Sequence, residues 1–334
     1  MIYLWQQQNW QQLLARYRNG NLPHAMLFNG VAGLGKFIFA ANFAKFLLCK
    51  NNNAGNDYAC ETCASCKLFQ ANNHPDFLLV QPEEVGKAIK VEQIRQLIED
   101  VGSTAHQGGM RVVVINAADA MNIAAANALL KTLEEPLGDV IIILVSSRPF
   151  ALPITVLSRC QKIVMELPRS DLAFNWLKQE CDAADIDAKM ALNVAYNAPL
   201  QALSLLQDDK LSLRKKILEE VMFCLQRNKQ SMNAIDFATT YVDVDSAFLL
   251  RIFFSVASDL LKLKSVVADE FITNIEHVQA MRACCKNFSA VKLMEYQSYL
   301  LELGKVIGNN IALNKQLLLE NMWMRLSRCT IIAS

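Results

Sequence analysis

The stretch from residue 24 to residue 48 constrains the fold more than any other part of the sequence. His24 to Asn29 (HAMLFN) is a short apolar run typical of a buried strand, and Lys36 to Leu48 is apolar enough for a core-facing helix. The loop between them reads GVAGLGKF and contains Gly30, Gly33, Gly35 and Lys36. A strand, a glycine loop and a helix in this order are the context of a phosphate-binding loop, and they predict a parallel sheet.

The glycine loop departs from the standard pattern at one position. Its glycines would let backbone N–H groups approach a phosphate, and Lys36 would add a positive charge at the helix N-terminus. Phe37, however, replaces the Ser or Thr whose hydroxyl holds Mg²⁺ beside the nucleotide. The sequence therefore indicates the ancestry of a phosphate loop, with a simple turn between strand and helix as the alternative.

A second departure follows the strand predicted at Arg111 to Ile115. In a hydrolysing nucleotide site this strand would end in the acids that bind Mg²⁺ and polarise water, but here it ends in Asn116 and Ala117. An amide is a poor Mg²⁺ ligand and a methyl group cannot act as a base. Asp119 lies three residues further on, and we expect it to cap or flank the next helix. Both departures predict that the chain does not hydrolyse nucleotide.

Strands and helices alternate over the first half of the chain. Further strand patterns lie at Phe77 to Val80, Val140 to Val145 and Gln161 to Met165, and helical patterns at Val91 to Thr104 and Met121 to Glu135. This alternation predicts an α/β domain at residues 1–167, with a parallel sheet covered on both faces.

Beyond Pro168 the strand patterns stop and only helical patterns continue. Three short ones, at Asp171 to Cys181, Ala183 to Tyr196 and Pro199 to Leu206, predict a small helical domain at residues 168–207. Longer amphipathic patterns predict a third, all-helical domain at residues 208–334, and they lie at Leu211 to Gln226, Val244 to Leu263, Ala290 to Ile307 and Asn314 to Leu326.

Size and charge limit the classes of function. A chain of 334 residues is long for one hydrophobic core, which favours two or three domains. The net charge of +1 gives no global positive field with which the chain could hold DNA alone. The sequence has no signal-peptide pattern at its start and no apolar run long enough for a membrane span, so we expect a cytoplasmic protein without a membrane partner.

Four of the ten cysteines stand at the spacing of metal ligands. Two-residue gaps allow successive thiolates to converge on one tetrahedral ion, and a distant fourth sulfur completes the shell. The four are Cys49, Cys60, Cys63 and Cys66. They predict a structural Zn²⁺ site in an insertion at residues 49–66, with scattered thiols or a redox pair as the alternatives.

Two further motifs carry a family resemblance. Asn127 to Pro136 (NALLKTLEEP) and Leu152 to Cys160 (LPITVLSRC) resemble the clamp-loader branch of the AAA+ proteins. The cysteine insertion after the glycine-loop helix narrows the resemblance to the zinc-bearing subunits of bacterial DNA polymerase III clamp loaders. The lost catalytic groups resemble the branch that does not hydrolyse ATP. The resemblance implies an AAA+ parallel-sheet domain with a zinc insertion, a three-helix lid and an all-α collar.

The resemblance also implies a role in a multi-subunit machine. Such subunits form a hetero-pentamer with gamma/tau and delta subunits, which loads the sliding clamp onto primer-template DNA. By this resemblance Arg159, flanked by Ser158 and Cys160, is an arginine finger that reaches the ATP of a neighbouring gamma/tau subunit, and Lys131 contacts template phosphate. Hydrolysis in the chain's own site is not expected, since Asn197 to Gln201 also lacks a sensor arginine; metal-free binding of ATP or ADP stays open.

Competing interpretations remain at this point. Arg159 and Lys131 can be ordinary solvated side chains on surface helices. The whole chain can be an ATP-hydrolysing gamma/tau-like subunit, or a zinc-dependent DNA-binding module. Phe37, Asn116 and Ala117 count against the first, and the near-neutral charge counts against the second.

Overall fold

The computed structural model describes residues 2–52, 55–84, 86–102, 109–136, 138–226, 233–265, 267–308 and 314–331. The chain divides into two compact units. One contains Met1–Asp182 and Ala195–Leu203, and the other contains Ala183–Val194 and Ser204–Ser334. The predicted division at residues 167/168 and 207/208 is not tested by this grouping and stays a prediction.

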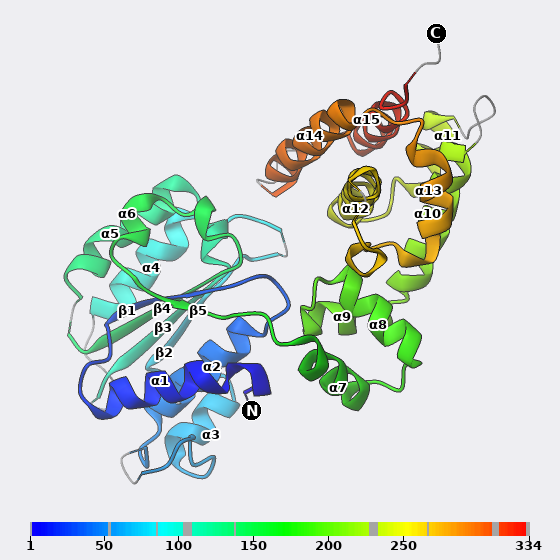
Figure 1. The fold of residues 1–334 in the computed structure, drawn as a ribbon. Helices are drawn as coiled ribbons and strands as arrows, with labels where there is room; N and C mark the ends of the chain where they lie inside the picture. Colours follow the sequence, from blue (N-terminus) through cyan, green and yellow to red (C-terminus); the bar gives the residue numbers. More distant parts are fainter. Residues whose placement is uncertain are drawn as a thin grey trace. The chain divides into compact units, whose positions relative to one another are not determined.

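The first unit is built on a five-stranded sheet (Figure 1). The strands are β1 (Ala25–Asn29), β2 (Phe77–Val80), β3 (Arg111–Asn116), β4 (Val140–Ser146) and β5 (Gln161–Val164). Their order is β2-β3-β4-β1-β5, and every adjacent pair is parallel. The structure thus confirms the predicted strands and the predicted parallel sheet. All five strands end at one edge, where the glycine loop follows β1.

Alternate residues of the central strands enter two separate cores. Leu27, Val113 and Ile142 pack with α4 (Val91–Gly102), α5 (Ile123–Glu134) and α6 (Ile154–Leu157). Their neighbours in sequence pack on the opposite face, with α1 (Gln7–Arg18) and α2 (Lys36–Leu48). Helices therefore cover both faces, as predicted for strands that are apolar throughout. The last residues of the helix expected at Val91 to Thr104, 103 and 104, lie outside the described residues.

Three helical elements of this unit were not predicted from sequence patterns. They are η1 (Leu4–Gln6), α1, and α3 (Ala64–Gln70), which has Cys63 as its N-cap and contains Cys66. Short 3₁₀ turns also lie at η2 (Ala118–Ala120) and η3 (Pro149–Ala151). The unit ends in α7 (Ser170–Glu180) and the first part of α9 (Pro199–Gln207).

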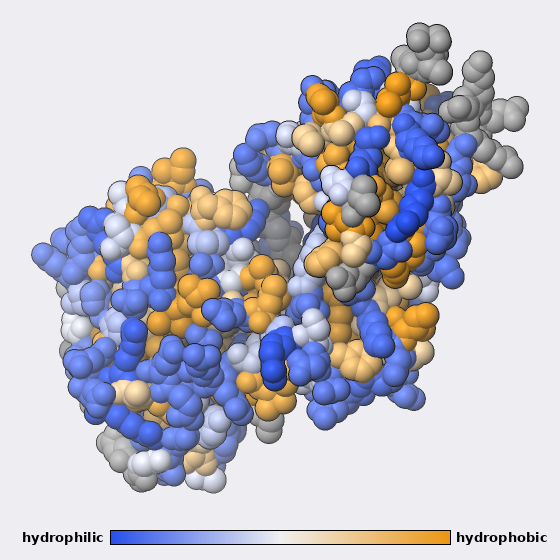
Figure 2. Space-filling model, viewed as in Figure 1, coloured by the Kyte–Doolittle hydropathy of each residue, from blue (hydrophilic) through white to orange (hydrophobic). Residues whose placement is uncertain are grey.

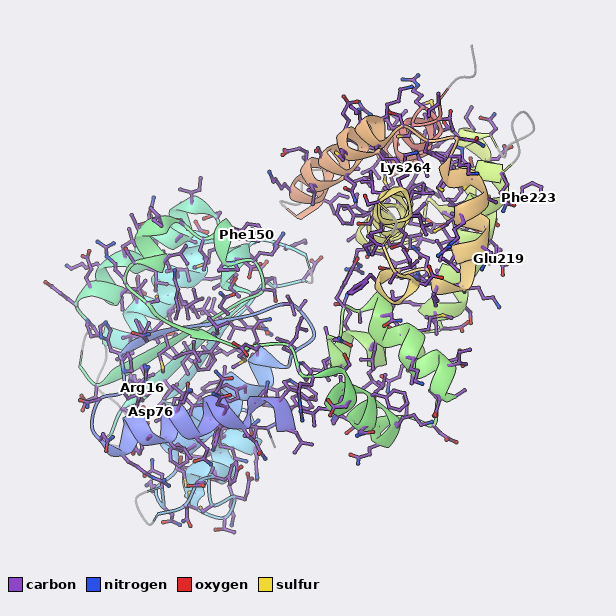
Figure 3. All side chains as sticks on the ribbon, viewed as in Figure 1. Arg16, Asp76, Phe150, Glu219, Phe223 and Lys264 are labelled. Atoms are coloured by element: carbon purple, nitrogen blue, oxygen red, sulfur yellow. The ribbon has the colours of Figure 1, made fainter. Side chains whose placement is uncertain are left out.

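The face seen in Figure 2 is largely hydrophilic, with apolar residues scattered over it. Phe150, in η3 (Figure 3), is the most exposed large apolar side chain among the described residues, at 78%. None of the helices described in the structure is both long enough and apolar enough to span a membrane.

The second unit consists of helices. They are α8 (Asp185–Val194), α10 (Lys210–Gln226), α11 (Ala234–Tyr241), α12 (Ser246–Lys264), α13 (Val278–Cys285), α14 (Ala290–Gly308) and α15 (Lys315–Ser327), with 3₁₀ turns η4 (Asp269–Phe271) and η5 (Ile275–His277). The helices predicted from amphipathic patterns are confirmed to within two residues at each end, whereas α11 and α13 were missed. The aromatic core of the second unit includes Phe237, Phe253 and Trp323, whose ring centroids lie 4.5 to 6.2 Å apart.

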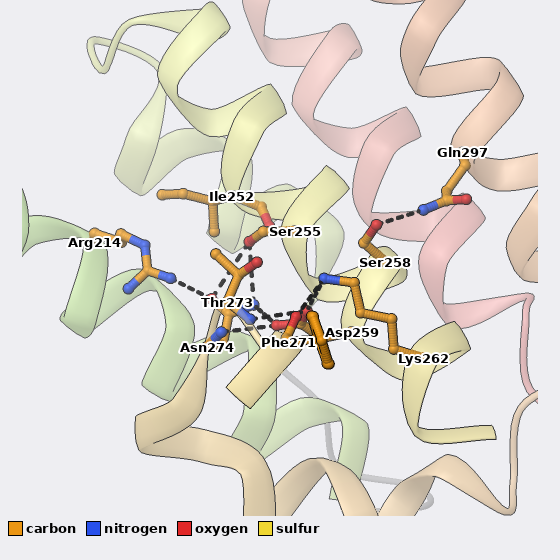
Figure 4. Close-up of polar contacts among 10 residues, drawn as sticks. All are labelled: Arg214, Ile252, Ser255, Ser258, Asp259, Lys262, Phe271, Thr273, Asn274 and Gln297. Atoms are coloured by element: carbon orange, nitrogen blue, oxygen red, sulfur yellow. Dashed lines mark hydrogen bonds and ion pairs between the residues drawn. The ribbon is translucent and has the colours of Figure 1, made fainter. Parts of the chain in front are cut away.

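A buried polar cluster fixes the segment between α12 and α13 (Figure 4). Asp259, which is fully buried in α12, accepts hydrogen bonds from the backbone N–H groups of Thr273 (3.1 Å) and Asn274 (2.8 Å). Arg214 of α10 donates to the Asn274 side chain and pairs with Glu276 at 2.6 Å. Each buried charge thus has a hydrogen-bonded partner, which is the condition for placing charges in a helical core.

Candidate functional site

The glycine loop, residues 30–36, lies where the fold places a phosphate cradle. It leaves the carboxyl end of β1 and enters α2, and Gly33 and Gly35 adopt left-handed backbone angles with φ of 83° and 78°. Such angles strain any residue with a Cβ, which explains glycine at these two positions. The loop therefore joins a central strand to a helix, which is the place in the fold where phosphate loops lie.

Other parts of the chain occupy the space against these glycines. A Cβ added at Gly30 would lie 2.5 Å from the carbonyl oxygen of Met165, and one at Gly33 would lie 2.8 Å from the Cβ of Gln201. A Cβ at Gly35 would run into the ring of Tyr3. The backbone N–H of Leu200 also donates to the carbonyl of Gly33 at 3.1 Å. The glycines are thus required for close packing of the chain on itself, independently of any phosphate.

The segment Tyr3–Gln6, here called the N-terminal segment, packs against Leu34 and Gly35 of the glycine loop. The side chain of Gln6 is fully buried and donates to the carbonyl of Leu34 at 2.8 Å, and the indole N–H of Trp5 donates to the same oxygen at 3.0 Å. Tyr3 stacks on Trp5 with centroids 4.7 Å apart, and Trp176 of α7 packs edge-on against both rings. The aromatic residues near the start of the sequence were the available signal for this contact.

Lys36 is also engaged by the chain itself. It is only 5% exposed, and its Nζ donates to the carbonyl of Val31 at 2.6 Å and to the hydroxyl of Ser147 at 2.9 Å. Burial lowers the pKa of Lys36 to about 8, against the opposing influence of the Asp119 carboxylate. The cation that would meet a phosphate is therefore partly desolvated and already hydrogen-bonded.

The departures from a hydrolysing site have structural counterparts. Phe37 is half-buried against the apolar core on the α1–α2 face of the sheet. Asn116 ends β3, and Ala117 follows it in the left-handed region with φ of 60°. These positions offer neither a metal ligand nor a base at the edge of the sheet.

The sequence predicted that Asp119 caps or flanks the following helix, and the structure shows that it flanks α5 without capping it. Asn122 is the N-cap of α5 and accepts a hydrogen bond from the N–H of Ala125 at 2.7 Å. Asp119 instead accepts from the N–H of Ser147 at 3.2 Å and from Arg148 Nε at 3.0 Å. Asp119 lies in a 3₁₀ turn just before the helix, and two donors at the end of β4 satisfy its carboxylate better than the helix N-terminus could.

The arginine turn, residues 155–160, joins α6 to β5. The hydroxyl of Ser158 donates to the carbonyl of Thr155 at 3.1 Å, and the thiol of Cys160 is buried in the core below, where burial raises its pKa to about 11. Arg159 lies between them with 32% of its side chain exposed. It donates through Nε to Glu134 at 2.6 Å and through Nη1 to the carbonyl of Thr155 at 2.8 Å. The turn therefore presents a cation at the surface, held by its own chain.

Lys131 lies three residues before Glu134 on α5, and its side chain is exposed. Nothing in the structure tests its expected contact with DNA. The segment expected to lack a sensor arginine, Asn197 to Gln201, packs on the glycine loop at Gly33, and its Asn197 bonds to Ser170 at 2.9 Å. This segment thus contributes a backbone contact to the loop and no positive charge.

The four predicted cysteine ligands come together in space. The sulfur atoms of Cys49, Cys60, Cys63 and Cys66 all lie within 4.8 Å of one another. Backbone N–H groups point at three of these sulfurs at 3.4 Å, which favours thiolates, whereas burial raises the pKa of Cys49 and of Cys66. A hydrogen bond from the Thr62 hydroxyl is the largest of the effects that lower the pKa of Cys60 to about 5. Four convergent sulfurs fit a closed tetrahedral metal site, and the cluster could bind a metal ion.

A buried chain of hydrogen bonds connects the cysteine cluster to the sheet. The hydroxyl of Ser65, the neighbour of Cys66, donates to the carbonyl of Leu48 at 2.6 Å and accepts from His74 Nε2 at 2.9 Å. His74 Nδ1 in turn accepts from the N–H of Asp76 at 3.1 Å, immediately before β2 (Figure 3). Burial lowers the pKa of His74, consistent with a neutral ring. The insertion is therefore fixed to the edge of the sheet.

Comparison with known proteins assigns the chain to a family. A family model described as "DNA polymerase III, delta subunit" matches residues 5–169, and one for the C-terminal part of that subunit matches residues 208–328. A DNA polymerase III subunit delta' from Pseudomonas aeruginosa is 33% identical over 96% of this chain and 95% of its own length. The chain belongs to the DNA polymerase III delta' family.

Other similarities are more distant. The delta' subunit from Yersinia pestis is 29% identical over 95% of this chain and 93% of its own length. A gamma-subunit-related DNA polymerase III protein from Thermotoga maritima aligns with 95% of this chain and 99% of its own, at 18% identity and a TM-score of 0.43. At that score the structural similarity adds nothing to the assignment, which rests on the sequences of the delta' family.

Proposed function

We propose that the chain is a non-hydrolysing delta' subunit of a clamp loader, whose chemical contribution is Arg159. In this role the subunit assembles with gamma/tau and delta subunits in the cytoplasm and helps load the sliding clamp onto primer-template DNA. Arg159 acts as a finger that stabilises the charge developing on ATP in an adjacent gamma/tau subunit. Ser158 and Cys160 hold the turn from which it projects.

The observation that carries the proposal is a contrast in access. The N-terminal segment packs against the chain's own glycine loop, where the Gln6 amide and the Trp5 indole both donate to the Leu34 carbonyl. The side chain of Arg159, in contrast, is 32% exposed to solvent. A subunit whose glycine loop is packed against its own chain and whose arginine is partly exposed is suited to serve a neighbour's nucleotide. We therefore expect neither ATP hydrolysis nor Mg²⁺-dependent ATP binding by the isolated chain.

The test is Arg159→Ala in a reconstituted loader. Loss of an arginine finger lowers turnover at the site that it serves by roughly 10³-fold. The total rate of DNA-stimulated ATP hydrolysis should therefore fall by the part that this one site contributes, while the subunits still assemble. Arg169→Ala is the control, since Arg169 is an arginine of the same unit with 86% of its side chain exposed. Full DNA-stimulated hydrolysis by the Arg159→Ala loader would exclude the finger.

Two further parts of the proposal concern ligands. We assign Zn²⁺ to Cys49, Cys60, Cys63 and Cys66, because four thiolates and no other donor suit this ion in a structural site. Elemental analysis of the purified protein should give one zinc per chain, and a zinc-free folded protein would contradict the assignment.

We assign Lys131 a contact with template phosphate. Lys131→Ala should then lower clamp loading at primer ends without weakening assembly of the subunits, and unchanged loading would reject the contact.

A further inference from the structure

The contacts of Arg159 show how its side chain is held when no neighbour is present. Nε and Nη2 both donate to the same oxygen of Glu134, Oε1, with the Nε distance at 2.6 Å. Nη1 donates to the carbonyl of Thr155 at 2.8 Å and lies 3.4 Å from the hydroxyl of Ser158. All three nitrogens of the guanidinium are therefore engaged by residues of this chain.

The edge that Glu134 occupies is the one best suited to a phosphate. Nε and Nη2 form a fork that binds carboxylates and phosphates through two parallel hydrogen bonds. An incoming phosphate oxygen at this fork would meet the negative charge of Glu134. Arg159 cannot offer the fork to a neighbouring nucleotide while it is paired with Glu134.

The pair is also weak enough to exchange. The side chains of Arg159 and Glu134 are 32% and 48% exposed, so water screens their attraction. Exposed ion pairs contribute about 0.2–1 kcal/mol in general. Glu134 is the last residue of α5, where the backbone carbonyls at the helix C-terminus also attract a cation. The arrangement restrains the arginine without fixing it permanently.

We infer that Glu134 is a positioning residue that keeps Arg159 folded against its own subunit until a neighbour's phosphate displaces the carboxylate. This inference rests on the proposed function of Arg159. When Arg159 engages the nucleotide, a phosphate oxygen replaces the Glu134 carboxylate as the partner of the guanidinium. Basal turnover in the assembled loader is therefore kept below the rate that an unrestrained arginine would support.

The adjacent glutamate supplies a matched control. Glu135 has the same charge, stands one residue further on and is exposed, and the described contacts of Arg159 do not include it. Glu134→Ala and Glu135→Ala thus remove the same charge from neighbouring positions at the end of α5. A difference between them measures the contact with Arg159, because general effects of surface charge are shared.

The first measurement uses the isolated full-length chain and does not depend on ATP hydrolysis. Exchange of the Arg159 Nε–H with solvent, followed by NMR on ¹⁵N-arginine-labelled protein, should be several-fold faster in Glu134→Ala than in the wild type. Glu135→Ala should exchange at the wild-type rate. Equal exchange in all three proteins would show that Glu134 does not hold Arg159, and would overturn the inference.

The second measurement is ATP turnover of the reconstituted loader without DNA or clamp. Glu134→Ala should raise turnover about two- to fivefold, which is the factor that corresponds to an exposed ion pair. Glu135→Ala should leave it unchanged, and Glu134→Ala should have no effect in an Arg159→Ala background. A merely structural role would lower turnover or leave it unchanged.

The two proposals fail in different ways. If Arg159→Ala lowers turnover while Glu134→Ala does not raise it, the restraint is rejected and the finger stands. If Arg159→Ala has no effect on turnover, the finger itself is rejected, and the role of Glu134 in its engagement is rejected with it.

Discussion

The glycine loop and the arginine turn carry opposite signals in sequence and in structure. The glycine loop has a nearly complete motif, yet three segments of the same chain pack against its glycines, and Lys36 bonds to Val31 and Ser147. The arginine turn is a shorter motif, yet Arg159 is partly exposed and is held only by a partly exposed ion pair with Glu134 and by hydrogen bonds within the turn. Completeness of a motif therefore says less about present chemistry than what its atoms contact.

This difference also separates two reasons for keeping a residue. The loop glycines support the fold, because an added Cβ would collide with Met165 at Gly30, with Gln201 at Gly33 and with Tyr3 at Gly35. The contacts of Arg159 within the chain are partly exposed, so we expect it to contribute little to stability and to act through contacts with a neighbour. Stability and activity measurements should therefore rank the two regions in opposite orders.

The largest expected effect on stability is at Gly35. Gly35→Ala should lower the free energy of unfolding by about 3 kcal/mol, since it adds left-handed backbone strain and forces the Tyr3 ring out of place. Gly20→Ala is the control, because Gly20 has a similar φ of 67° but no atom within 4 Å of an added Cβ. It should cost about 1 kcal/mol in urea unfolding. Equal losses would mean that the loop is not filled in solution.

The next effect concerns the buried amide of Gln6. Gln6→Ala should destabilise the protein by about 2 kcal/mol, because it removes the bond to Leu34 and leaves the N–H of Tyr3 without the Gln6 oxygen at 3.1 Å. Gln8→Ala, an exposed change in the adjoining helix, should be within about 0.5 kcal/mol of wild type. A Gln6→Ala protein as stable as Gln8→Ala would contradict the packed N-terminal segment.

Burial of Lys36 should make the free energy of unfolding depend on pH. Burial lowers its pKa in the folded state to about 8, so between pH 8 and its ordinary value near 10.5 the unfolded chain binds more protons than the folded one. Stability should therefore rise with pH across this window, by about 1–2 kcal/mol relative to Lys36→Met. Parallel stability curves for the two proteins from pH 7.5 to pH 10 would indicate a solvated lysine open to phosphate.

Sequence patterns predicted the sheet well because its central strands β1, β3 and β4 are apolar on both faces. The bounds of β2 and α2 agree with the prediction at both ends, and β3 and β4 differ by one residue. Helix α1 was missed because glutamines occupy much of its length, and α3 because it is short and begins within the polar cysteine insertion. Periodicity reports burial along one element, so it is weakest where an element is short or mostly polar.

The candidate site was only partly predictable for a related reason. Spacing alone brought the four cysteines together, because their ligand geometry is local. The contact of Tyr3 and Gln6 with the glycine loop joins residues about thirty positions apart, and no local pattern encodes it. Asp119 flanks the predicted helix without capping it, because its carboxylate accepts hydrogen bonds from Ser147 and Arg148, which follow β4.

The smallest expected effect is at the arginine turn, and it completes the contrast. Arg159→Ala should change the free energy of unfolding by no more than about 0.5 kcal/mol, since it breaks one exposed ion pair and leaves Cys160 packed in the core. Urea unfolding of the isolated chain measures this, with Glu134→Ala expected to give a similarly small change. A loss above about 2 kcal/mol would place Arg159 among the residues that hold the fold, and a fall in loader activity could then no longer be assigned to the finger. A stable Arg159→Ala protein that impairs the loader, beside an unstable Gly35→Ala protein, would show that Arg159 acts in the reaction and that Gly35 supports the fold.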